Sequence, residues 1–314
     1  MAEASSIGRH RFAVATAAAT YVLLFIGGLV TSTGSGLAVP DWPLSFGQVF
    51  PAMVGGVLFE HGHRLAASTV GLLTVILTVW TVMRETRPGV RLLAMLMMLA
   101  VILQGVLGGV TVLYKLPLAV SVTHACLAQI FFCLSVTMAV VTAPAWGAPR
   151  RRPLELGAPL PALAACTTAA IFVQLVLGAL VRHSGAGLAI PDFPLAFGRL
   201  VPPFDTSLIA IHFAHRVGAA VVSALVITLA IAAVRHRPAD DRLVRLAVLS
   251  LGLLAAQVTL GALIVWTRRA VVPTTTHLVI GAGLLATCLV VTLRAGRSAV
   301  ATSMAPGLRH AVPA

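Results

Sequence analysis

The sequence GSGLAVPDWPLSFG at residues 34–47 recurs as GAGLAIPDFPLAFG at residues 185–198, and this repetition guides the interpretation of the rest of the chain. The second copy begins 151 positions after the first. Other motifs recur in the same order at nearly the same spacing: His63-Arg64 with His215-Arg216, and His124 with His277. Motifs that keep their order while their spacing drifts slowly indicate duplication. We therefore predict two related halves.

Between these motifs the chain is strongly apolar. Of its 314 residues, 59% are hydrophobic and 10% are charged, and its mean hydropathy is +0.99. A soluble domain usually carries about 25% charged residues. The formal net charge is +13, but the basic residues fall in short clusters between apolar runs, as membrane topology signals do. This distribution favours a membrane protein and argues against nucleic-acid binding.

Apolar stretches of about 20 residues are long enough to cross a bilayer as helices. In hydrocarbon, only helices and closed β-barrels form hydrogen bonds with all of their backbone groups. The long apolar runs lack the alternating pattern of barrel strands, which leaves helices. We therefore predict an all-α integral membrane protein whose eight transmembrane helices form two parallel four-helix-bundle repeats. The predicted spans are approximately 12–33, 63–83, 92–113, 118–143, 161–182, 209–234, 243–266 and 271–293.

The predicted domains are an N-terminal repeat at residues 1–145, a cytoplasmic linker at 146–160 and a C-terminal repeat at 161–314. Most of the 22 lysines and arginines fall on the side of the two termini. The positive-inside rule then places both termini in the cytoplasm, so that the even-numbered spans begin at the outer face. The short segment before the first span does not resemble a transit peptide, and we expect a bacterial plasma membrane protein.

Four of the ten histidines lie in the first turns of even-numbered spans, at one depth toward the outer face: His63, His124, His215 and His277. Polar residues within a span are costly and usually have a specific role. A zinc or copper site is expected to recruit carboxylate or thiolate ligands as well. Two imidazoles from two helices of one bundle instead suit the two axial positions of a haem. We predict that His63 pairs with His124, and His215 with His277.

The residue three positions before each HisArg pair differs between the halves. Glu60 precedes His63, and His212 precedes His215. Residues at i and i+3 share a helix face, so Glu60 is expected to face the His63 pocket and His212 the other pocket. A carboxylate beside a haem in a low-dielectric site can transfer a proton or stabilise positive charge. This asymmetry favours chemistry in the N-terminal half and a permanently bound haem in the C-terminal half.

Several other residues receive simpler interpretations. Arg64 and Arg216 follow their histidines directly and are candidates for contacts with haem propionates, with interfacial anchoring as the alternative. The repeated loops are either structural lids or lids that cover a ligand. Gln104, Gln174 and Gln257 recur in Gln-x-x-Leu-Gly motifs and are expected to serve helix packing. The remaining histidines are not expected to bind a ligand: His10, His61, His183, His236 and His310.

In these residues the sequence resembles the haem A synthase family, also called the cytochrome oxidase assembly protein family. The resemblance covers nearly the whole chain and rests on residues 33–37, 60–64 and 212–216 together with His124 and His277. It implies a haem-dependent oxidoreductase that converts a methyl group of haem O to a formyl group, giving haem A for cytochrome oxidase. It also implies the following roles: Glu60 as the essential carboxylate, His63 and His124 around the substrate haem O, and His215 and His277 as ligands of an electron-transferring haem b.

One departure and several alternatives accompany this resemblance. Many family members carry two cysteines in the first outer loop, where this chain has Val39 and Ser45, so a disulfide there is excluded. The alternative functions are a di-haem b electron-transfer protein, a non-catalytic haem carrier and a transporter. A transporter is disfavoured because its polar residues should line a path near the midplane. Expected partners are haem O, membrane lipid, haem O synthase and an electron donor such as a quinol, and an oligomer is compatible with the sequence.

Overall fold

The computed structural model describes residues 2–147, 160–236 and 241–303. Eight helices in these ranges are long and apolar enough to cross a membrane, and no β-strand forms there, which confirms the predicted fold class. The long helices are α1 (Ala2–Ser32), α2 (Gly56–Arg84), α3 (Pro88–Leu113), α4 (Leu118–Val141), α6 (Leu160–His183), α7 (Ser207–His236), α8 (Asp241–Trp266) and α9 (Val271–Ser303). Two short elements accompany them, α5 (Pro144–Gly147) and the 3₁₀ helix η1 (Ala186–Leu188).

Several helices extend beyond the predicted spans. Helix α2 begins at Gly56 rather than 63, α1 begins at Ala2 rather than 12, and α9 ends at Ser303 rather than 293. Hydropathy ends a span where polar residues begin, but Glu60 and His61 are buried within the first turns of α2. Most of the predicted linker at 146–160 lies outside the described residues, because α5 ends at Gly147 and the description resumes at α6.

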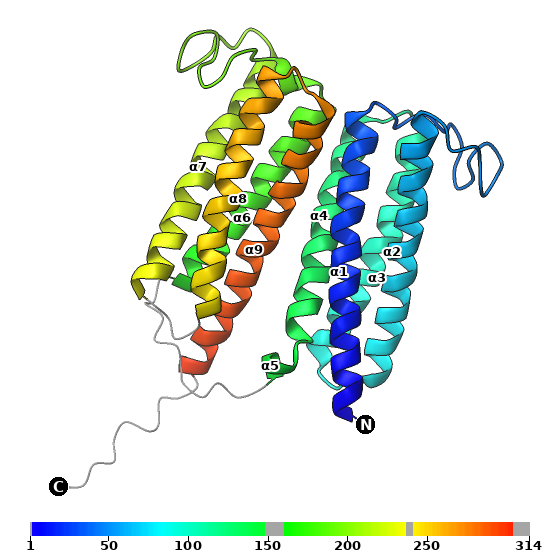
Figure 1. Cartoon of the computed structure of the whole chain (residues 1–314), viewed down its shortest axis with the longest axis vertical. Helices are drawn as coiled ribbons and strands as arrows, with labels where there is room; N and C mark the ends of the chain where they lie inside the picture. The colour runs from blue at the N-terminus through cyan, green and yellow to red at the C-terminus, as the bar shows by residue number, and fades with distance from the viewer. Residues whose placement is uncertain (1, 148–159, 237–240, 304–314) are drawn as a thin grey trace.

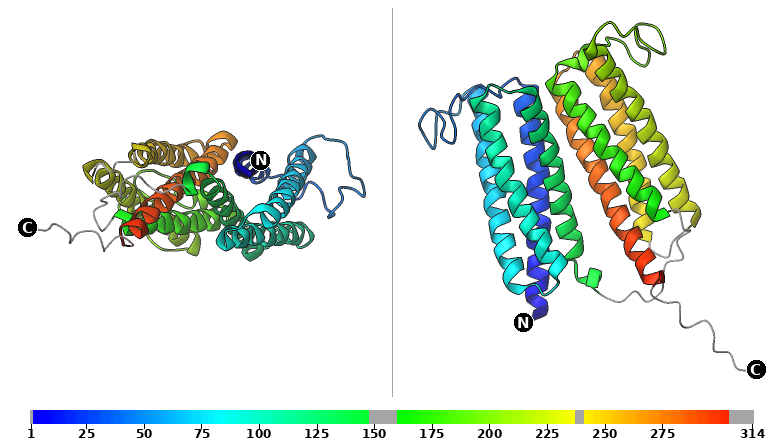
Figure 2. Two further views of the ribbon diagram at one scale, coloured as in Figure 1. Left: turned by 90° about the horizontal axis from the view of Figure 1, so that it is seen from below. Right: turned by 180° about the vertical axis from the view of Figure 1, so that it is seen from behind.

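The long helices form two groups that stand side by side (Figures 1 and 2). Helices α1–α4 make up the first group and α6–α9 the second, and α1 and α4 of the first contact α6 and α9 of the second. The α1–α2 and α6–α7 loops project from the same end of the molecule, called the loop end here. The N-terminus lies at the opposite, terminus end. The duplication itself stays a prediction from the sequence.

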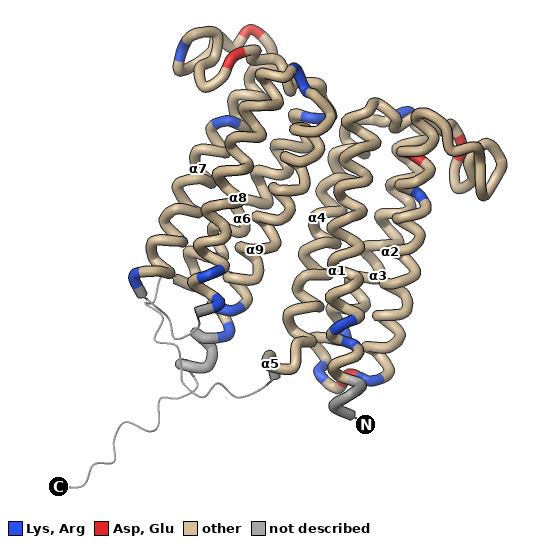
Figure 3. The backbone as a smooth tube through the Cα atoms, viewed as in Figure 1, with Lys and Arg blue, Asp and Glu red and all other residues tan. Residues whose placement is uncertain are grey.

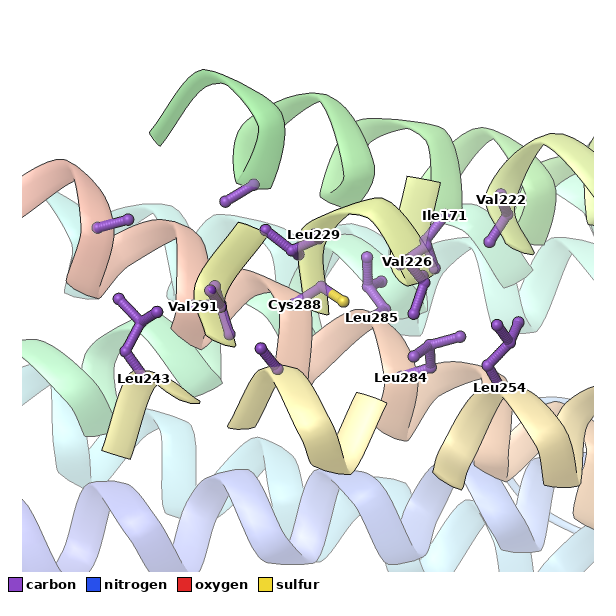
Figure 4. Packing of buried hydrophobic residues seen from close by; sticks show 14 of the residues in the cluster. Ile171, Val222, Val226, Leu229, Leu243, Leu254, Leu284, Leu285, Cys288 and Val291 are labelled. Carbon is purple, nitrogen blue, oxygen red and sulfur yellow. The ribbon is translucent and has the colours of Figure 1, made fainter. Parts of the chain in front are cut away.

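Each group has its own apolar core. In the second group the core runs along all four helices and includes Leu229, Leu285 and Val291, each at most 1% exposed (Figure 4). The first group has a separate cluster that includes Leu77 and Met97. Large apolar side chains also cover the outside of the helices, such as Leu72. An apolar exterior of this kind fits lipid as the surrounding solvent.

Helix ends and loops follow local sequence signals. Pro88 opens α3, and Pro117 precedes α4, which suits a residue that cannot donate a backbone hydrogen bond. Thr206 caps α7 by accepting a hydrogen bond from the Ile209 amide at 3.3 Å. Pro117 and Thr206 thus set where α4 and α7 start, and therefore how far below the loop end His124 and His215 lie.

Charged residues lie mainly at the two ends of the helices, while the middle of each helix is uncharged (Figure 3). At the terminus end, Glu85 lies between α2 and α3. Its carboxylate accepts hydrogen bonds from Arg9 of α1 at 2.7 Å and from Arg87 at 2.8 and 3.0 Å. Arg87 also donates to the Val141 carbonyl of α4 at 3.0 Å. Glu85 therefore ties three parts of the first group together.

Polar contacts also join the two groups. Arg182 of α6 donates to the Gly28 carbonyl at 2.7 Å and to the Ser32 hydroxyl at 2.8 Å, both on α1. Tyr21 of α1 donates to the Val279 carbonyl of α9 at 3.0 Å. The Arg182 charge is thus placed at the junction between the groups, near the loop end.

Candidate functional site

The four predicted histidines lie at matching depths on four different helices. His63 is on α2, His124 on α4, His215 on α7 and His277 on α9. Counting 1.5 Å per residue from each helix start, all four lie about 9–12 Å below the loop end. The helices thus hold four imidazoles in one layer, in agreement with the prediction from the sequence.

Each imidazole contacts a glycine on a neighbouring helix. A Cβ added to Gly27 of α1 would lie 3.1 Å from His63 Cε1, and the same distance separates Gly178 of α6 from His215. The other two histidines match each other as well: the distances are 3.5 Å from Gly108 to His124 and 3.4 Å from Gly261 to His277. Any larger residue at Gly27 or Gly178 would crowd the ring. These glycines were not recognised as site residues from the sequence, although Gly108, Gly178 and Gly261 end the Gln-x-x-Leu-Gly motifs.

The pairing of the histidines stays a prediction, and the electrostatic contacts between the rings are compatible with it. His63 and His124 lie close enough for charges on the two rings to interact, and so do His215 and His277. Among the described residues, no group of three or more His, Cys, Asp or Glu side chains could hold a metal ion. Each pair therefore offers two imidazoles without a third protein ligand. This donor set fits an iron whose remaining positions are filled by a porphyrin.

Glu60 is buried and engaged with the first loop. Its Oε2 accepts a hydrogen bond from the Val39 amide at 2.8 Å, and its Oε1 accepts one from Arg64 at 2.8 Å. Only 5% of the carboxylate side chain is exposed. The position one helical turn before His63 is as predicted, and both oxygens have partners within the protein.

His212 makes the corresponding contacts in the second half. Its Nδ1 accepts a hydrogen bond from the Ile190 amide at 3.2 Å, and its Nε2 lies 3.4 Å from Nε of Arg216. The loop amide and the arginine thus have a partner at the same place in both halves. The carboxylate of Glu60 and the imidazole of His212 fill the same structural position with different chemistry.

Arg64 and Arg216 bind the backbones of their own loops. Arg64 donates to the carbonyl oxygens of Asp41 and Leu44, both at 2.7 Å. Arg216 donates to the carbonyls of Asp192 at 2.7 Å and Leu195 at 2.8 Å. Each guanidinium therefore holds a loop over its bundle, a function that the sequence did not predict. The contact with propionates stays a prediction.

The two loops are stabilised by the same aspartate turn. Asp41 accepts hydrogen bonds from the amides of Phe46 at 2.7 Å and Gly47 at 2.8 Å, and Asp192 accepts the equivalent pair at the same distances. Phe46 and Gly47 have φ angles of 53° and 71°. The backbone hydrogen bonds lower the pKa of both carboxyl groups below the usual range. Both aspartates are therefore ionised at neutral pH and keep the loops in one conformation.

A buried pair of polar residues lies beside Glu60 in the first half. Nδ1 of His61 is 2.8 Å from the Ser45 hydroxyl, which also accepts a hydrogen bond from Arg64 at 3.2 Å. His61 is 5% exposed, and its Nε2 is buried without a partner among the described residues. Residues 61 and 63 point to different sides of a helix, and for this reason His61 was not expected to share the His63 pocket. The helical direction alone could not show that His61 packs against the loop.

We expected His183 in the outer loop that follows the fifth span, but it is the last residue of α6. It lies close enough to His124 for the charges on the two rings to interact, although His124 belongs to the other group of helices. Arg182 beside it has the same relation to His277. The end of α6 therefore lies between the two histidine pairs. His10 lies on α1 with a buried Nδ1, the side chain of His236 is not described, and His310 lies outside the described residues.

Comparisons with known proteins identify similar sequences. A family described as cytochrome oxidase assembly protein matches residues 53–289, a range that contains all four site histidines and Glu60. The protein named Heme A synthase from Symbiobacterium thermophilum is 36% identical over 259 residues, which covers 80% of this chain and 84% of that protein. The protein named Heme A synthase from Shouchella clausii is 31% identical over 271 residues, which covers 84% of this chain and 88% of that protein. The protein of the same name from Halalkalibacterium halodurans is 29% identical over 302 residues, which covers 92% of this chain and 98% of that protein.

Proposed function

This chain belongs to the cytochrome oxidase assembly protein family, and on that premise we propose that it is a haem A synthase, which oxidises a methyl group of haem O to the formyl group of haem A. The observation that carries the proposal is the layer of two imidazole pairs, each flanked by glycines. Two histidines without further ligands suit a haem iron, and the haem supplies the oxidative chemistry when bound. The protein supplies ligands, orientation and charge.

We propose that the two halves have different tasks. His215 and His277 would hold a haem b that passes electrons, and His63 and His124 would hold the substrate haem O. The contrast between Glu60 and His212 supports this division, because both residues make the same loop contacts. A carboxylate is therefore not required to hold the loop. Its presence only in the first half favours a chemical function there.

Glu60 would act as the acid–base or electrostatic group at the substrate. In a low-dielectric site a carboxylate strongly stabilises a positive charge that develops nearby, and it can accept a proton. Its contacts with the Val39 amide and Arg64 hold it in place.

Orientation and partners follow from the arrangement of charge. We propose a bacterial plasma membrane location with the terminus end in the cytoplasm and the haem sites toward the outer face, because arginines are numerous at the terminus end (Figure 3). Haem O would arrive from a haem O synthase within the membrane. Electrons would come from a membrane-soluble donor such as a quinol, since the sequence has no nucleotide-binding motif. An oligomer stays an expectation.

The test is expression in a bacterium that makes haem O but no haem A, followed by extraction and chromatography of the membrane haems. We expect haem A, or its hydroxymethyl precursor, with the wild-type chain. Bound haem b with untouched haem O, in a well-expressed protein with a reductant present, would instead favour an electron-transfer protein or a haem carrier.

A Glu60→Gln variant tests the catalytic assignment. It should keep bound haem b and lose haem A formation by about 100-fold or more, the usual scale of general acid–base catalysis. Glu85→Gln is the matched control, because it neutralises a second buried carboxylate of the first group, at the terminus end and away from the histidines. Unchanged conversion in Glu60→Gln would contradict a catalytic function for Glu60.

A further inference from the structure

The Nδ1 atoms of the four histidines have different surroundings in the two halves. In the second half, Nδ1 of His215 is 3.0 Å from Nε2 of Gln174, and Nδ1 of His277 donates to the Gln257 carbonyl at 3.1 Å. In the first half, Nδ1 of His63 and Nδ1 of His124 are buried and have no hydrogen-bond partner among the described residues. Both rings of the second pair therefore have a hydrogen-bond partner at Nδ1, whereas His63 of the first pair has none among the described residues.

The clearest difference concerns His63 and His215. Gln174 lies four residues before Gly178, the glycine against His215, and its Nε2 also donates to the His215 carbonyl at 2.8 Å. The residue four positions before Gly27, the glycine against His63, is Leu23. Leu23 packs against the apolar core of the first group and has no polar atom to offer. The first half thus lacks the anchoring side chain.

A second position changes together with this one. Gly218, three residues after His215, lies against Gln174, and a Cβ there would collide with Oε1 of Gln174. The residue three positions after His63 is Ala66. The Gln174 side chain therefore requires glycine at position 218 of the facing helix. In the first half, Leu23 occurs together with Ala66 instead. Two differences that compensate each other sterically indicate a specific arrangement rather than chance variation at one site.

The contrast at the second histidine of each pair is smaller. His277 Nδ1 must be the donor to the Gln257 carbonyl, which leaves Nε2 free to bind iron. The ring of His124 interacts with the equivalent backbone of Gln104, but outside strict hydrogen-bond geometry. Gln104 donates only to the backbone carbonyl of His124, at 3.0 Å. His124 and His277 therefore differ only in degree, and the clear contrast is between His63 and His215.

We infer that Gln174 and Gly218 form an anchor that makes His215 a permanent iron ligand, whereas Leu23 and Ala66 leave His63 able to release the iron. This inference rests on the proposed function, in which the second site keeps its haem and the first must admit haem O and discharge haem A. Hydrogen bonds to the far nitrogen orient a ligating histidine and raise its basicity. A substrate site needs the opposite, a ligand that can dissociate.

The glutamine can serve either protonation state of the ring. Ligation through Nε2 requires a proton on Nδ1, which needs an acceptor. Oε1 of Gln174 is buried beside Gly218 without a hydrogen-bond partner among the described residues. Exchange of the amide oxygen and nitrogen would bring Oε1 to Nδ1–H, at the cost of the hydrogen bond to the His215 carbonyl. We therefore assign Gln174 as a positioning residue for His215, with its amide oxygen toward Nδ1–H in the iron-binding state.

Reciprocal exchange of the two pairs of residues tests the inference in the full-length purified protein. The variants are L23Q/A66G, which installs the anchor beside His63, and Q174L/G218A, which removes it from His215. Release of bound haem is measured as transfer to excess apomyoglobin, with haem b as the probe. His63→Ala and His215→Ala backgrounds assign each phase to a site.

We expect haem release from the second site to accelerate about 10- to 100-fold in Q174L/G218A, the usual effect of losing such a partner. Release from the first site should slow by about tenfold in L23Q/A66G. A Q174E variant, which keeps an acceptor for Nδ1–H, should retain slow release. Unchanged rates in both exchange variants would overturn the inference.

A second measurement does not depend on haem. Nitrogen NMR of the ¹⁵N-histidine-labelled apoprotein reports whether Nδ1 of each ring is hydrogen-bonded. We expect the His215 signal to move in Q174L/G218A, and the His63 signal to move in L23Q/A66G. If the signals move as expected but the first site takes up no haem, the proposed function fails and the anchor stands. If the signals do not move, the anchor itself is refuted.

Discussion

The α1–α2 and α6–α7 loops can be compared directly, because they make the same backbone contacts with the helices below them. The side chains that pack beneath the two loops differ. In the first half, Ser45 and His61 form a buried polar pair beside Glu60. The corresponding residues of the second half are Ala196 and Phe213, which pack with the apolar cluster under that loop. The loop fold therefore does not require the polar pair. Polar groups that the fold does not need are candidates for function, and they accumulate on the side that contains Glu60.

Other differences between the halves are compensated within each half. The Trp42 ring packs so closely on Gly109 that a Cβ there would lie 2.7 Å away. In the second half a smaller ring, Phe193, takes the place of tryptophan, and Ala262 takes the place of this glycine. Such exchanges preserve packing and predict little about chemistry. The exchange of Glu60 for His212 differs, because it changes charge at a buried site without changing the contacts.

The largest expected effect separates the histidine pairs. His215→Ala should abolish bound haem b, because removal of one of two axial ligands leaves the iron without a stable low-spin arrangement. His63→Ala should leave haem b in place. Absorption spectra of the purified variants, normalised to protein, measure this contrast. Loss of haem b in His63→Ala with retention in His215→Ala would show that the assigned tasks are inverted.

The next effect concerns the position shared by Glu60 and His212. Glu60→His gives the first half the residue of the second and should still accept the Val39 amide. We expect a stable protein that retains haem b and forms haem A about 100-fold more slowly or worse, because an imidazole cannot replace a carboxylate that stabilises positive charge. Haem A formation close to the wild-type rate would mean that the asymmetry serves another purpose.

The polar pair under the first loop predicts a moderate effect on stability. Ser45→Ala alone should lower the free energy of unfolding by about 1–3 kcal/mol, because it leaves a buried nitrogen of His61 without a partner. The double variant S45A/H61F copies the second half and should recover most of this loss. Thermal unfolding in detergent measures both. Equal losses in the single and double variants would show that the two side chains are not coupled.

The smallest effect is a dependence of stability on acid. Arg87 and Arg9 lower the pKa of Glu85 from an ordinary value near 4.5 to about 2. The Glu85 carboxylate is therefore protonated less readily in the folded protein than in the unfolded chain. The stabilisation is present above about pH 4.5 and is lost as the pH falls toward 2. Glu85→Gln should cost about 1–2 kcal/mol at neutral pH, and unfolding midpoints between pH 3 and 7 should vary less in the variant.

Much of the candidate site could be predicted because it depends on one-dimensional patterns. The spacing of His124 from its predicted span start already gave its depth, since a helix rises by a constant amount per residue. The span predicted for His63 began at His63 itself and missed the first two turns of α2. The glycines and glutamines around the rings could not be assigned in this way. Gln174 was read as a packing residue, and only its contact with His215 identifies it as part of the site.

The sequence by itself determined eight membrane-spanning helices, the layer of four histidines and the position of Glu60, because hydropathy and helical spacing are local properties of the chain. Only the tertiary structure decided which nitrogen atoms have partners. The contact between Gln174 and His215 joins residues 41 positions apart, and that between Ser45 and His61 joins a loop to a helix. Such contacts depend on how neighbouring helices and loops pack against each other. This packing depends on side-chain volume at positions such as Gly218, which the hydrophobic periodicity of the sequence does not predict.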